Sequence, residues 1–410
     1  MQDHPRVTRH ASRVTIILMR PKIYLKKHEE NRVNSGHPWI FSNEINTIEG
    51  IYQDGDIVDV CDFKKKYVGT GYFNSHSLIT VRILSREHID IDRKFIFSRI
   101  MDSLNYRDKI IVNREAFRII FSESDFLPGL IVDKYGKFLV MQFLTLGIEK
   151  FMNDIVDIFR EIFSPAAIIL RNDSPFRKLE GLKQEKIILG GIQKNELQDF
   201  SIEEGSVRFK VDLWDGQKTG FFLDQRSNRD YFSSLNLSGK GLDCFCYSGA
   251  WALRAGNRSD VTCIDASDSA IALARANAAM NLYSDKMEFI KEDVFDFLSS
   301  CIAKKKFFDW IILDPPAFVK NKKKVKEAIA GYRELNLRAM KLLVPGGILV
   351  TSSCSHNLRE DVFFRLLKEA SMSAKREARI IACGNQSPDH PVLLSMPESK
   401  YLKCVFMNII

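Results

Sequence analysis

The sequence lacks the features that mark membrane, secreted and zinc-binding proteins. None of its apolar runs approaches the roughly 18 residues that a membrane span needs, which excludes an integral membrane protein. Its eight cysteines form no CxxC pair and no cluster at the spacing of metal ligands. These absences argue against a zinc module and a disulfide scaffold and favour a reducing compartment. We therefore expect a cytoplasmic protein without a metal ion.

A large excess of charge of one sign is missing as well. The formal net charge is +8, from 60 Lys and Arg against 52 Asp and Glu. Residues 1–22 supply half of it, with five basic residues and one acid. The remaining charge is too small to coat a polyanion without specificity, so any nucleic acid must be held by local patches.

The first 20 residues lack the apolar core of a signal peptide and show no regular period. We predict that residues 1–20 are a disordered tail or an over-extended start, with Met19 as the natural first residue. A transit peptide is the alternative.

The rest of the chain divides into three parts. A length of 410 residues predicts two or three domains, and 45% apolar and 27% charged residues are typical of a globular protein. Residues 21–88 alternate short strand-like pieces with turns and contain no helical period, which predicts a small β domain. Residues 89–205 predict a central α/β domain with a helix over 93–118, two strands around the turn 134–136 and a helix over 148–163.

Residues 206–410 alternate apolar strands with helical patterns. The expected strands are 241–246, 261–266, 287–293, 307–314 and 347–355, and the expected helices are 250–257, 268–280, 294–303, 327–343 and 358–370. This rhythm predicts an α/β fold with a doubly wound, Rossmann-like parallel sheet. Such a sheet binds ligands beyond the carboxyl ends of its strands, which selects Phe245, Tyr247, Ser248, Gly249, Asp265, Asp293, Asp314 and Cys354.

The turn after the first strand of this sheet, DCFCYSG, contains no GxGxxG fingerprint. A dinucleotide needs those glycines so that its pyrophosphate can approach the backbone, so a dehydrogenase is disfavoured. A cofactor without phosphates, such as S-adenosylmethionine, needs less bare backbone; a plain strand–helix turn is the alternative. Asp265 could accept both hydroxyls of an adenosine ribose. Asp293 could bind the adenine amino group or cap the helix that follows it.

The segment from Asp314 to Phe318, DPPAF, is more specific. Two prolines fix the backbone and remove two donors, so Pro315 and Pro316 predict a rigid ledge beside the Asp314 carboxylate. Such a ledge suits an enzyme that clamps a planar base, with Phe318 available to stack on it. The basic run that follows predicts phosphate contacts through Lys320, Lys322, Lys323, Lys324 and Lys326.

Cys354, in TSSCSH, is the one cysteine expected beyond the carboxyl end of a parallel strand, next to the DPPAF strand. We interpret it as a nucleophile, although most buried cysteines are inert. His356 could activate that thiol, contact RNA or cap the next helix.

With these residues in place, nearly the whole chain (about 21–410) resembles the 23S ribosomal RNA (cytosine-5)-methyltransferase I family of class I S-adenosylmethionine-dependent enzymes. The resemblance lies in GHPWIFSNEI, ESDFLPGLIVDKY, KTGFFLDQRSNR, LDCFCYSGAWAL, ILDPPAF, YRELNLRAMKLLVPGG, TSSCSH and DHPVLLSMPESKYLKC. It implies a PUA-like RNA-binding domain over 21–88, a central domain over 89–205 and a methyltransferase domain over 206–410. It also implies cofactor contacts from Gln225 and Arg226.

The resemblance implies a reaction as well. The Cys354 thiolate would add to carbon 6 of a cytosine in 23S ribosomal RNA or its precursor, and Asp314 would stabilise the adduct. Better-known RNA cytosine methyltransferases carry a second cysteine after the fourth-strand motif, where this chain has Ala317 and Phe318. The group that removes the carbon 5 proton is therefore unassigned.

Three other functions stay open at this point. The same fold could methylate guanine N7 or another ribosomal RNA base without a covalent intermediate. An oxidoreductase and a non-catalytic RNA-binding protein are the other two. The sequence does not decide between a monomer and a homodimer.

Overall fold

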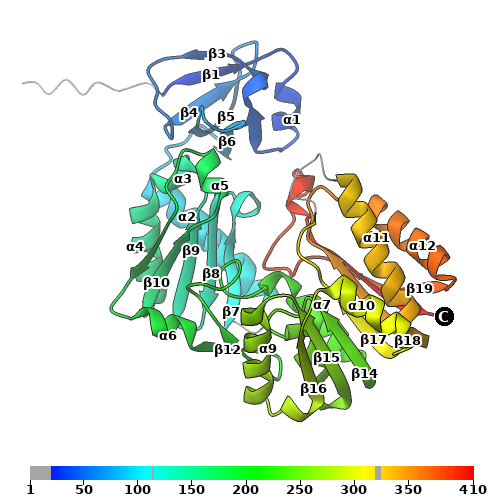
Figure 1. Cartoon of the computed structure of the whole chain (residues 1–410). Helices are drawn as coiled ribbons and strands as arrows, with labels where there is room; N and C mark the ends of the chain where they lie inside the picture. Colours follow the sequence, from blue (N-terminus) through cyan, green and yellow to red (C-terminus); the bar gives the residue numbers. More distant parts are fainter. Residues whose placement is uncertain (1–19, 113–114, 319–324) are drawn as a thin grey trace, which may run out of the picture.

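The computed structural model describes residues 20–112, 115–318 and 325–410. The expected tail and all the lysines of the 320–324 run therefore lie outside the described residues. The described chain forms three stacked parts (Figure 1): a small β domain above, an α/β domain with a five-stranded sheet, and a larger α/β domain with a seven-stranded sheet. No helix among these residues is long and apolar enough to cross a membrane.

The N-terminal domain is a six-stranded sheet in the order β2-β6-β5-β4-β1-β3. Its strands are β1 (Lys22–Leu25), β2 (Trp39–Phe41), β3 (Ile45–Glu49), β4 (Ile57–Cys61), β5 (Tyr67–Phe73) and β6 (Ile79–Ser85). The prediction of a β domain is confirmed, but the prediction that it holds no helix is wrong. A helix of five residues, α1 (Glu30–Asn34), and a 3₁₀ turn, η1 (Ser42–Glu44), interrupt it. Both are too short to produce a 3.6-residue period in the sequence.

The central domain has a sheet in the order β11-β10-β9-β8-β7. Its strands are β7 (Ala116–Phe121), β8 (Leu130–Tyr135), β9 (Phe138–Phe143), β10 (Ala167–Asn172) and β11 (Glu185–Leu189), and its helices are α2 (Arg93–Ile110), α3 (Leu146–Glu149), α4 (Met152–Phe163), α5 (Phe176–Leu179) and α6 (Lys194–Gln198). The helix expected over 93–118 is too long, because it ends at Ile110 and residues 116–118 start β7. The apolar residues of β7 are buried against the sheet and cannot be told from a helix face by composition alone.

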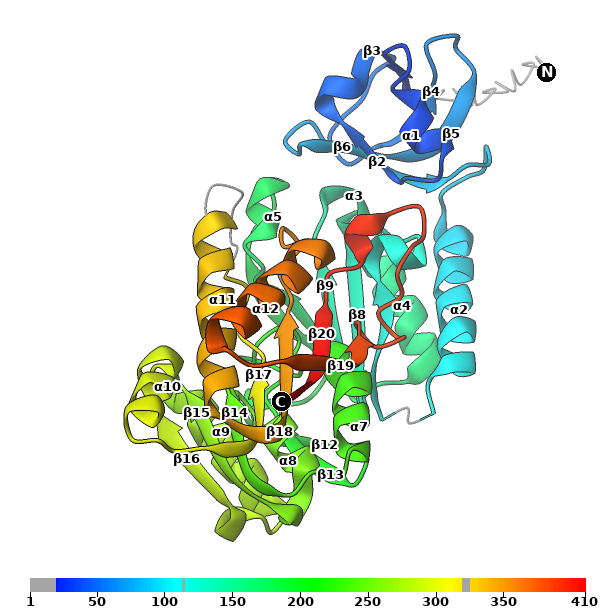
Figure 2. The same ribbon diagram turned by 90° about the vertical axis from the view of Figure 1, so that its right-hand side faces the viewer.

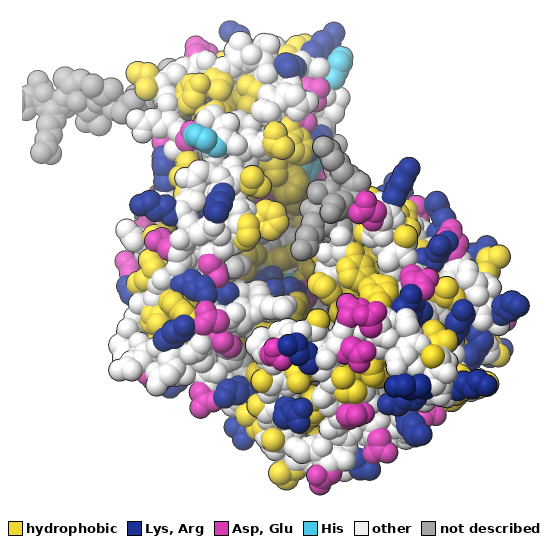
Figure 3. Space-filling view, viewed as in Figure 1, with side chains coloured by type: hydrophobic (Ala, Val, Ile, Leu, Met, Phe, Trp, Pro, Cys, Tyr) yellow, Lys and Arg dark blue, Asp and Glu magenta, His cyan; other side chains and the backbone are white. Residues whose placement is uncertain are grey.

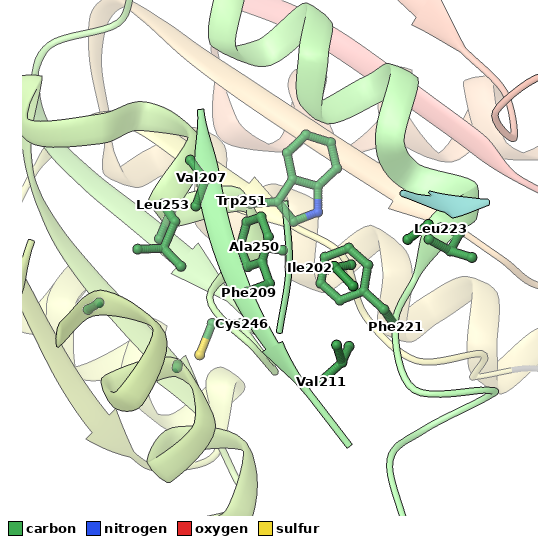
Figure 4. Close-up of a cluster of buried hydrophobic side chains, with 14 of the residues drawn as sticks. Ile202, Val207, Phe209, Val211, Phe221, Leu223, Cys246, Ala250, Trp251 and Leu253 are labelled. Carbon is green, nitrogen blue, oxygen red and sulfur yellow. The ribbon is translucent and has the colours of Figure 1, made fainter. Parts of the chain in front are cut away.

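A two-stranded hairpin, β12 (Phe200–Glu204) and β13 (Val207–Val211), joins the central domain to the last one. The boundary expected near residue 205 falls in its turn, between two paired strands. Figure 4 shows the inner side chains of the hairpin beside Trp251 and Phe221. This packing fixes Trp251, on the short helix α8 (Ala250–Ala255), below the site described next.

The C-terminal domain contains the predicted parallel sheet. Its strand order is β16-β15-β14-β17-β18-β20-β19, with β14 to β18 parallel and β20 antiparallel to both of its neighbours. The strands are β14 (Gly239–Cys244), β15 (Ser259–Asp265), β16 (Met287–Lys291), β17 (Phe308–Leu313), β18 (Leu343–Ser353), β19 (Ala378–Gly384) and β20 (Lys403–Ile409). The antiparallel strand is a departure from the purely parallel sheet that we expected.

Helices cover both faces of this sheet (Figures 1 and 2). Alternate strand residues point to opposite sides: Leu242 and Leu313 pack with one set of helices, and Trp310 and Phe406 with the other. The first set is α10 (Val294–Ala303), α11 (Val325–Leu342) and α12 (Glu360–Ala374); the second is α7 (Arg226–Ser234), α8 and α9 (Asp268–Met280). The expected helices of this domain are therefore confirmed, and their ends differ from the predicted ones by a few residues.

The connection from β19 to β20, residues 385–402, leaves the sheet and reaches the central domain. Asp389 accepts a hydrogen bond from the Arg118 backbone N–H at 3.0 Å, and Arg107 donates to the Asp389 carbonyl at 2.8 Å. The terminal hairpin expected over 389–404 is thus a long crossing segment that binds the two α/β domains together before β20 begins.

Candidate active site

A cavity of about 280 Å³ lies at the carboxyl ends of the parallel strands. Ten of the residues selected from the sequence line it: Gln225, Phe245, Tyr247, Ser248, Asp265, Asp293, Asp314, Pro315, Pro316 and Cys354. Gly249, Arg226 and Phe318 are not in its wall. The cavity therefore collects residues that are up to 129 positions apart in the sequence, as the ends of neighbouring parallel strands should.

The turn after β14 curls around one side of the cavity. Phe245, Tyr247 and Gly249 all have left-handed backbones, with φ of 62°, 46° and 72°. A side chain on Gly249 would be strained in that conformation and would press on Ala274, whose Cβ lies 3.3 Å from the ideal Cβ position. The backbone thus bends sharply here without the glycines of a dinucleotide fingerprint.

Two carboxylates stand at the rim beyond β15 and β16. Asp265 is partly exposed and accepts hydrogen bonds from the backbone N–H groups of Tyr247, at 3.1 Å, and Ser267, at 2.9 Å. Asp293 caps α10, because its Oδ1 accepts from the N–H groups of Phe295 and Asp296. Both capping bonds use one oxygen, so Oδ2 can serve a ligand as well, and the two functions weighed for Asp293 are compatible.

Asp314 occupies the floor of the cavity and is held from two sides. The Trp251 indole N–H donates to its Oδ2 at 3.0 Å, and the Gln225 side-chain amide lies 3.1 Å from both carboxylate oxygens. Burial raises the pKa of Asp314, and the negative charge of Asp224 adds to this effect, while the hydrogen bonds from Trp251 and Gln225 oppose it. A carboxyl with a raised pKa can donate or accept a hydrogen bond near neutral pH.

The proline ledge is present, but its aromatic residue has another partner. Pro315 is buried, Pro316 is exposed, and both line the cavity. The Phe318 ring packs on Tyr332, with ring centroids 4.8 Å apart, and also contacts Phe245. Phe318 therefore supports the cavity wall in this structure and does not present a free stacking surface.

Cys354 follows β18 and contributes to the same wall as Asp314. Burial raises the pKa of its thiol to about 11, and the positive charge of Lys218 opposes that rise. The prediction that it alone lies beyond a parallel strand is wrong, because β14 ends at Cys244 and Cys246 also reaches the cavity. Cys246 is buried, however, and a hydrogen bond with Cys263 raises its pKa.

The structure places two other selected residues away from the cavity. Arg226 points into a buried ionic cluster, where its guanidinium donates to the Ala116 carbonyl and lies 3.7 Å from Glu204. We therefore do not retain it as a cofactor contact. His356 is exposed and its ring stacks on Tyr401 at 5.3 Å. It does not cap α12, since that helix begins after Arg359.

The sequence analysis missed a cluster at the opposite wall. Lys218 donates to the Asp224 carboxylate at 2.6 Å, and the Tyr401 hydroxyl donates to the same oxygen at 2.6 Å. Lys218, Asp224 and Phe222 all line the cavity. Their signal was the segment KTGFFLDQR, which carries both charges but no strand or helix period that would place them.

Comparison with known proteins identifies the two outer domains. A family model described as a PUA-like domain matches residues 23–86, and one described as an S-adenosylmethionine-dependent methyltransferase matches residues 189–392. Curated relatives match over nearly the full length. Ribosomal RNA large subunit methyltransferase I of Pseudoalteromonas atlantica is 38% identical over 98% of this chain and 100% of its own. The protein of the same name from Tolumonas auensis is 35% identical over 96% and 100%.

Solved structures share the fold at lower identity. A chain from Streptococcus mutans, described as an S-adenosylmethionine-dependent methyltransferase, is 20% identical with a TM-score of 0.80. It covers 94% of this chain, and 99% of its own length is matched. A methyltransferase crystallised with S-adenosylhomocysteine (SAH) aligns with the same identity, TM-score and coverage.

Proposed function

The chain belongs to the ribosomal RNA large subunit methyltransferase I family, and from this premise we propose that it methylates carbon 5 of a cytosine in large-subunit ribosomal RNA. It is an S-adenosylmethionine-dependent enzyme with a PUA-like and a Rossmann-like domain. One observation carries the choice of atom: Cys354 and Asp314 line a single cavity at the carboxyl ends of neighbouring strands.

The residues of the cavity fit the cofactor. The Asp265 carboxylate at the rim suits the two ribose hydroxyls, and Asp293 Oδ2 suits the adenine amino group. Phe245 and Val294 supply apolar wall for the adenine ring. The bent turn at Phe245–Gly249 and the Gln225 side chain complete the proposed cofactor set. S-adenosylmethionine supplies an electrophilic methyl group when it is bound.

Carbon 5 of cytosine needs activation before it can accept a methyl group. In the proposed reaction the Cys354 thiolate forms a bond to carbon 6, and the electron pair of the 5,6 double bond moves toward carbon 5. After methylation carbon 5 loses its proton, the bond between sulfur and carbon 6 breaks, and the double bond is restored. The thiolate is thereby regenerated.

Asp314 has a different part in this proposal. Its raised pKa makes the protonated form accessible, so the carboxyl can donate a hydrogen bond to the pyrimidine edge near nitrogen 3 as negative charge develops there. Trp251 and Gln225 hold the carboxyl in place, and Pro315 and Pro316 make the adjacent backbone rigid. The proposed substrate ledge therefore stands without Phe318.

The target base must leave its RNA stack to reach the cavity. Figure 3 shows a hollow between the N-terminal domain and the two α/β domains, with apolar side chains gathered in it. We propose that the RNA lies on this face, held by the N-terminal domain and by the lysines after the DPPAF ledge, of which Lys326 is described and exposed.

The experiment is methylation of a 23S ribosomal RNA transcript with labelled S-adenosylmethionine, followed by digestion and identification of the labelled nucleoside. We expect 5-methylcytidine from the native protein. Cys354→Ala should lower the rate by at least about 10³-fold, as expected when a covalent nucleophile is removed. Cys383→Ser is the control, because Cys383 is exposed and lies outside the cavity. Full activity of Cys354→Ala would contradict the covalent mechanism.

A second candidate is methylation of guanine N7. That ring nitrogen is already nucleophilic, and the observation in its favour is the Cys354 pKa of about 11, which leaves little thiolate at neutral pH. The same digestion distinguishes the two, since 7-methylguanosine would replace 5-methylcytidine and Cys354→Ala would keep its activity.

A further inference from the structure

The inference concerns the ammonium group that faces Cys354, and it rests on the proposed function, in which that thiol must lose its proton. Six ionisable side chains surround the thiol: Lys218, Asp224, Asp314, Tyr332, Tyr401 and Lys403. Two of them are lysines, and their geometry differs.

Lys403 is buried behind the strand end and bound to the backbone. Its Nζ donates to the carbonyls of Ser355, at 2.9 Å, and Leu358, at 2.8 Å. These bonds fix the loop after Cys354. Burial lowers the Lys403 pKa to about 8, so this lysine carries less than a full charge at alkaline pH.

Lys218 approaches from the other side and reaches the cavity itself. Its Nζ is held at 2.6 Å by Asp224, which is buried in turn by the Tyr401 hydroxyl bond. Burial alone would raise the Asp224 pKa, but the charge of Lys218 holds it well below its ordinary value, so the pair is ionised. Asp224 Oδ1 is buried and has no hydrogen-bond partner among the described residues.

The backbone of Lys218 gives an independent sign of constraint. Its φ is +53°, a left-handed conformation that glycine adopts freely and lysine does not. The next residue is anchored in the central domain, because the Thr219 hydroxyl donates to Asp133 at 2.6 Å. Strained residues that the surrounding structure holds in place gather at functional sites.

We propose that Lys218 is a positioning residue that favours the thiolate of Cys354, with Asp224 as the anchor that keeps its ammonium group at the cavity wall. In this step the sulfur–hydrogen bond breaks, the proton passes to water, and both electrons stay on sulfur beside the ammonium, which keeps its own protons. Arg229, the other described cation in the wall, is committed to Glu204 through two bonds of 2.6 Å.

The test is the pH profile of Cys354 alkylation by iodoacetamide in the full-length protein without RNA. The background carries Cys383→Ser, since Cys383 is exposed, and the modified peptides are resolved by mass spectrometry. We expect Lys218→Met to move the midpoint for Cys354 upward by about one pH unit, as loss of a nearby opposite charge should. Lys218→Arg should restore most of the shift.

Asp224→Asn should move the midpoint the other way, because it removes a carboxylate that opposes ionisation of the thiol. Partial unfolding would expose the thiol in both variants and could not give shifts of opposite sign. The matched control is Lys186→Met, a lysine that binds Asp215 at 2.9 Å outside the cavity and should leave the profile unchanged.

An unchanged midpoint in Lys218→Met, or a shift equal to that of the control, overturns the inference. The result is separate from the fate of the proposed function, because the thiol is titrated without methylation. With RNA, kcat of Lys218→Met should fall about tenfold at pH 7 and recover as the pH rises, if the thiolate is the reacting species.

Discussion

The central sheet and the C-terminal sheet both bury carboxylates, and they treat them in opposite ways. In the central sheet, Asp133 is fully buried and receives two hydrogen bonds of 2.7 Å from Arg118. At the carboxyl ends of the C-terminal sheet, Asp314 and Asp243 are buried without a cation bound to them, and burial raises the pKa of both. One sheet neutralises its charges and the other keeps them in an uncompensated state.

This difference teaches where chemistry can take place. A carboxylate in a buried ion pair is fixed, because removing either partner leaves a bare charge. A carboxyl whose pKa is raised toward neutral pH can change its protonation state or hydrogen-bond partner at little cost. The central domain is thus built as a support, and its polar contacts to Thr219 and Asp389 hold the cavity wall and the 385–402 connection in place.

The sharpest way to break the comparison is to unpair the support. Asp133→Asn leaves the Arg118 guanidinium buried and unpaired, so we expect a loss of about 3–5 kcal/mol in the free energy of unfolding. Denaturant unfolding measures this loss. The control is Asp157→Asn, because the Asp157–Arg160 pair is exposed and should contribute less than about 1 kcal/mol. Equal effects of the two substitutions would mean that the buried pair is not specially stabilising.

Asp314→Asn tests the other side of the comparison. Because the carboxyl is proposed to assist the reacting base, we expect kcat to fall about 10²–10³-fold, or about 3–4 kcal/mol on the barrier. Stability should be unchanged or higher, since a buried charge without a bound cation is removed. Asp309→Asn serves as the control on the same strand, as Asp309 binds the Lys240 N–H at the opposite end of β17. A merely destabilised protein with normal kcat would refute this assignment.

Asp243 makes the comparison measurable as a function of pH. Burial raises its pKa to about 8 in the folded protein, whereas an unfolded Asp ionises near pH 3.9. The folded state therefore holds a proton that the unfolded state has lost between these values, and the stability contributed by this group falls as pH rises through that window. From pH 5.5 to pH 7 the loss should be about 2 kcal/mol.

Asp243→Asn cannot ionise and should lack this decline. Parallel unfolding curves at pH 5.5 and 7.0 for the native protein, this variant and the exposed-site control Asp285→Asn measure the difference. If the native protein and Asp243→Asn lose stability equally over this range, Asp243 does not carry a raised pKa.

The smallest expected effect separates capping from ligand binding at Asp293. Asp293→Ala removes the cap of α10 and should cost about 1 kcal/mol of stability as well as cofactor affinity. Asp293→Ser keeps a capping oxygen but offers no second carboxylate oxygen. We expect it to recover the stability, measured by thermal melting, and not the S-adenosylmethionine affinity, measured by calorimetry. Recovery of both would leave Asp293 with capping as its only function.

Much of the C-terminal domain could be predicted because its signals are local. Helix α9 follows a capping Ser267 and has the predicted bounds 268–280, and β17 is an unbroken apolar run that only a sheet covered on both faces can bury. The rule that ligands bind beyond parallel strands then selected residues that do line one cavity. The catalytic and cofactor roles of those residues remain predictions.

Other features could not be predicted because their signals are not local. The strand β7 reads like the end of helix α2, and only pairing with β8 makes it a strand. The two charges of KTGFFLDQR lie in irregular backbone, and Lys218 meets the cavity only because Thr219 and Asp224 are held by the central domain and by Tyr401. Arg226 and Phe318 were misplaced for the same reason, since partners from distant segments turn their side chains away from the cavity.

The sequence by itself determined the order of the domains, the doubly wound sheet and the set of strand ends at which the site must lie. These depend on hydrophobic period and turn residues, which act over a few positions along the chain. Only the tertiary structure decided which of those polar groups are neutralised and which are left to react. That decision depends on burial and on the nearest opposite charge, which the fold brings from more than a hundred residues away.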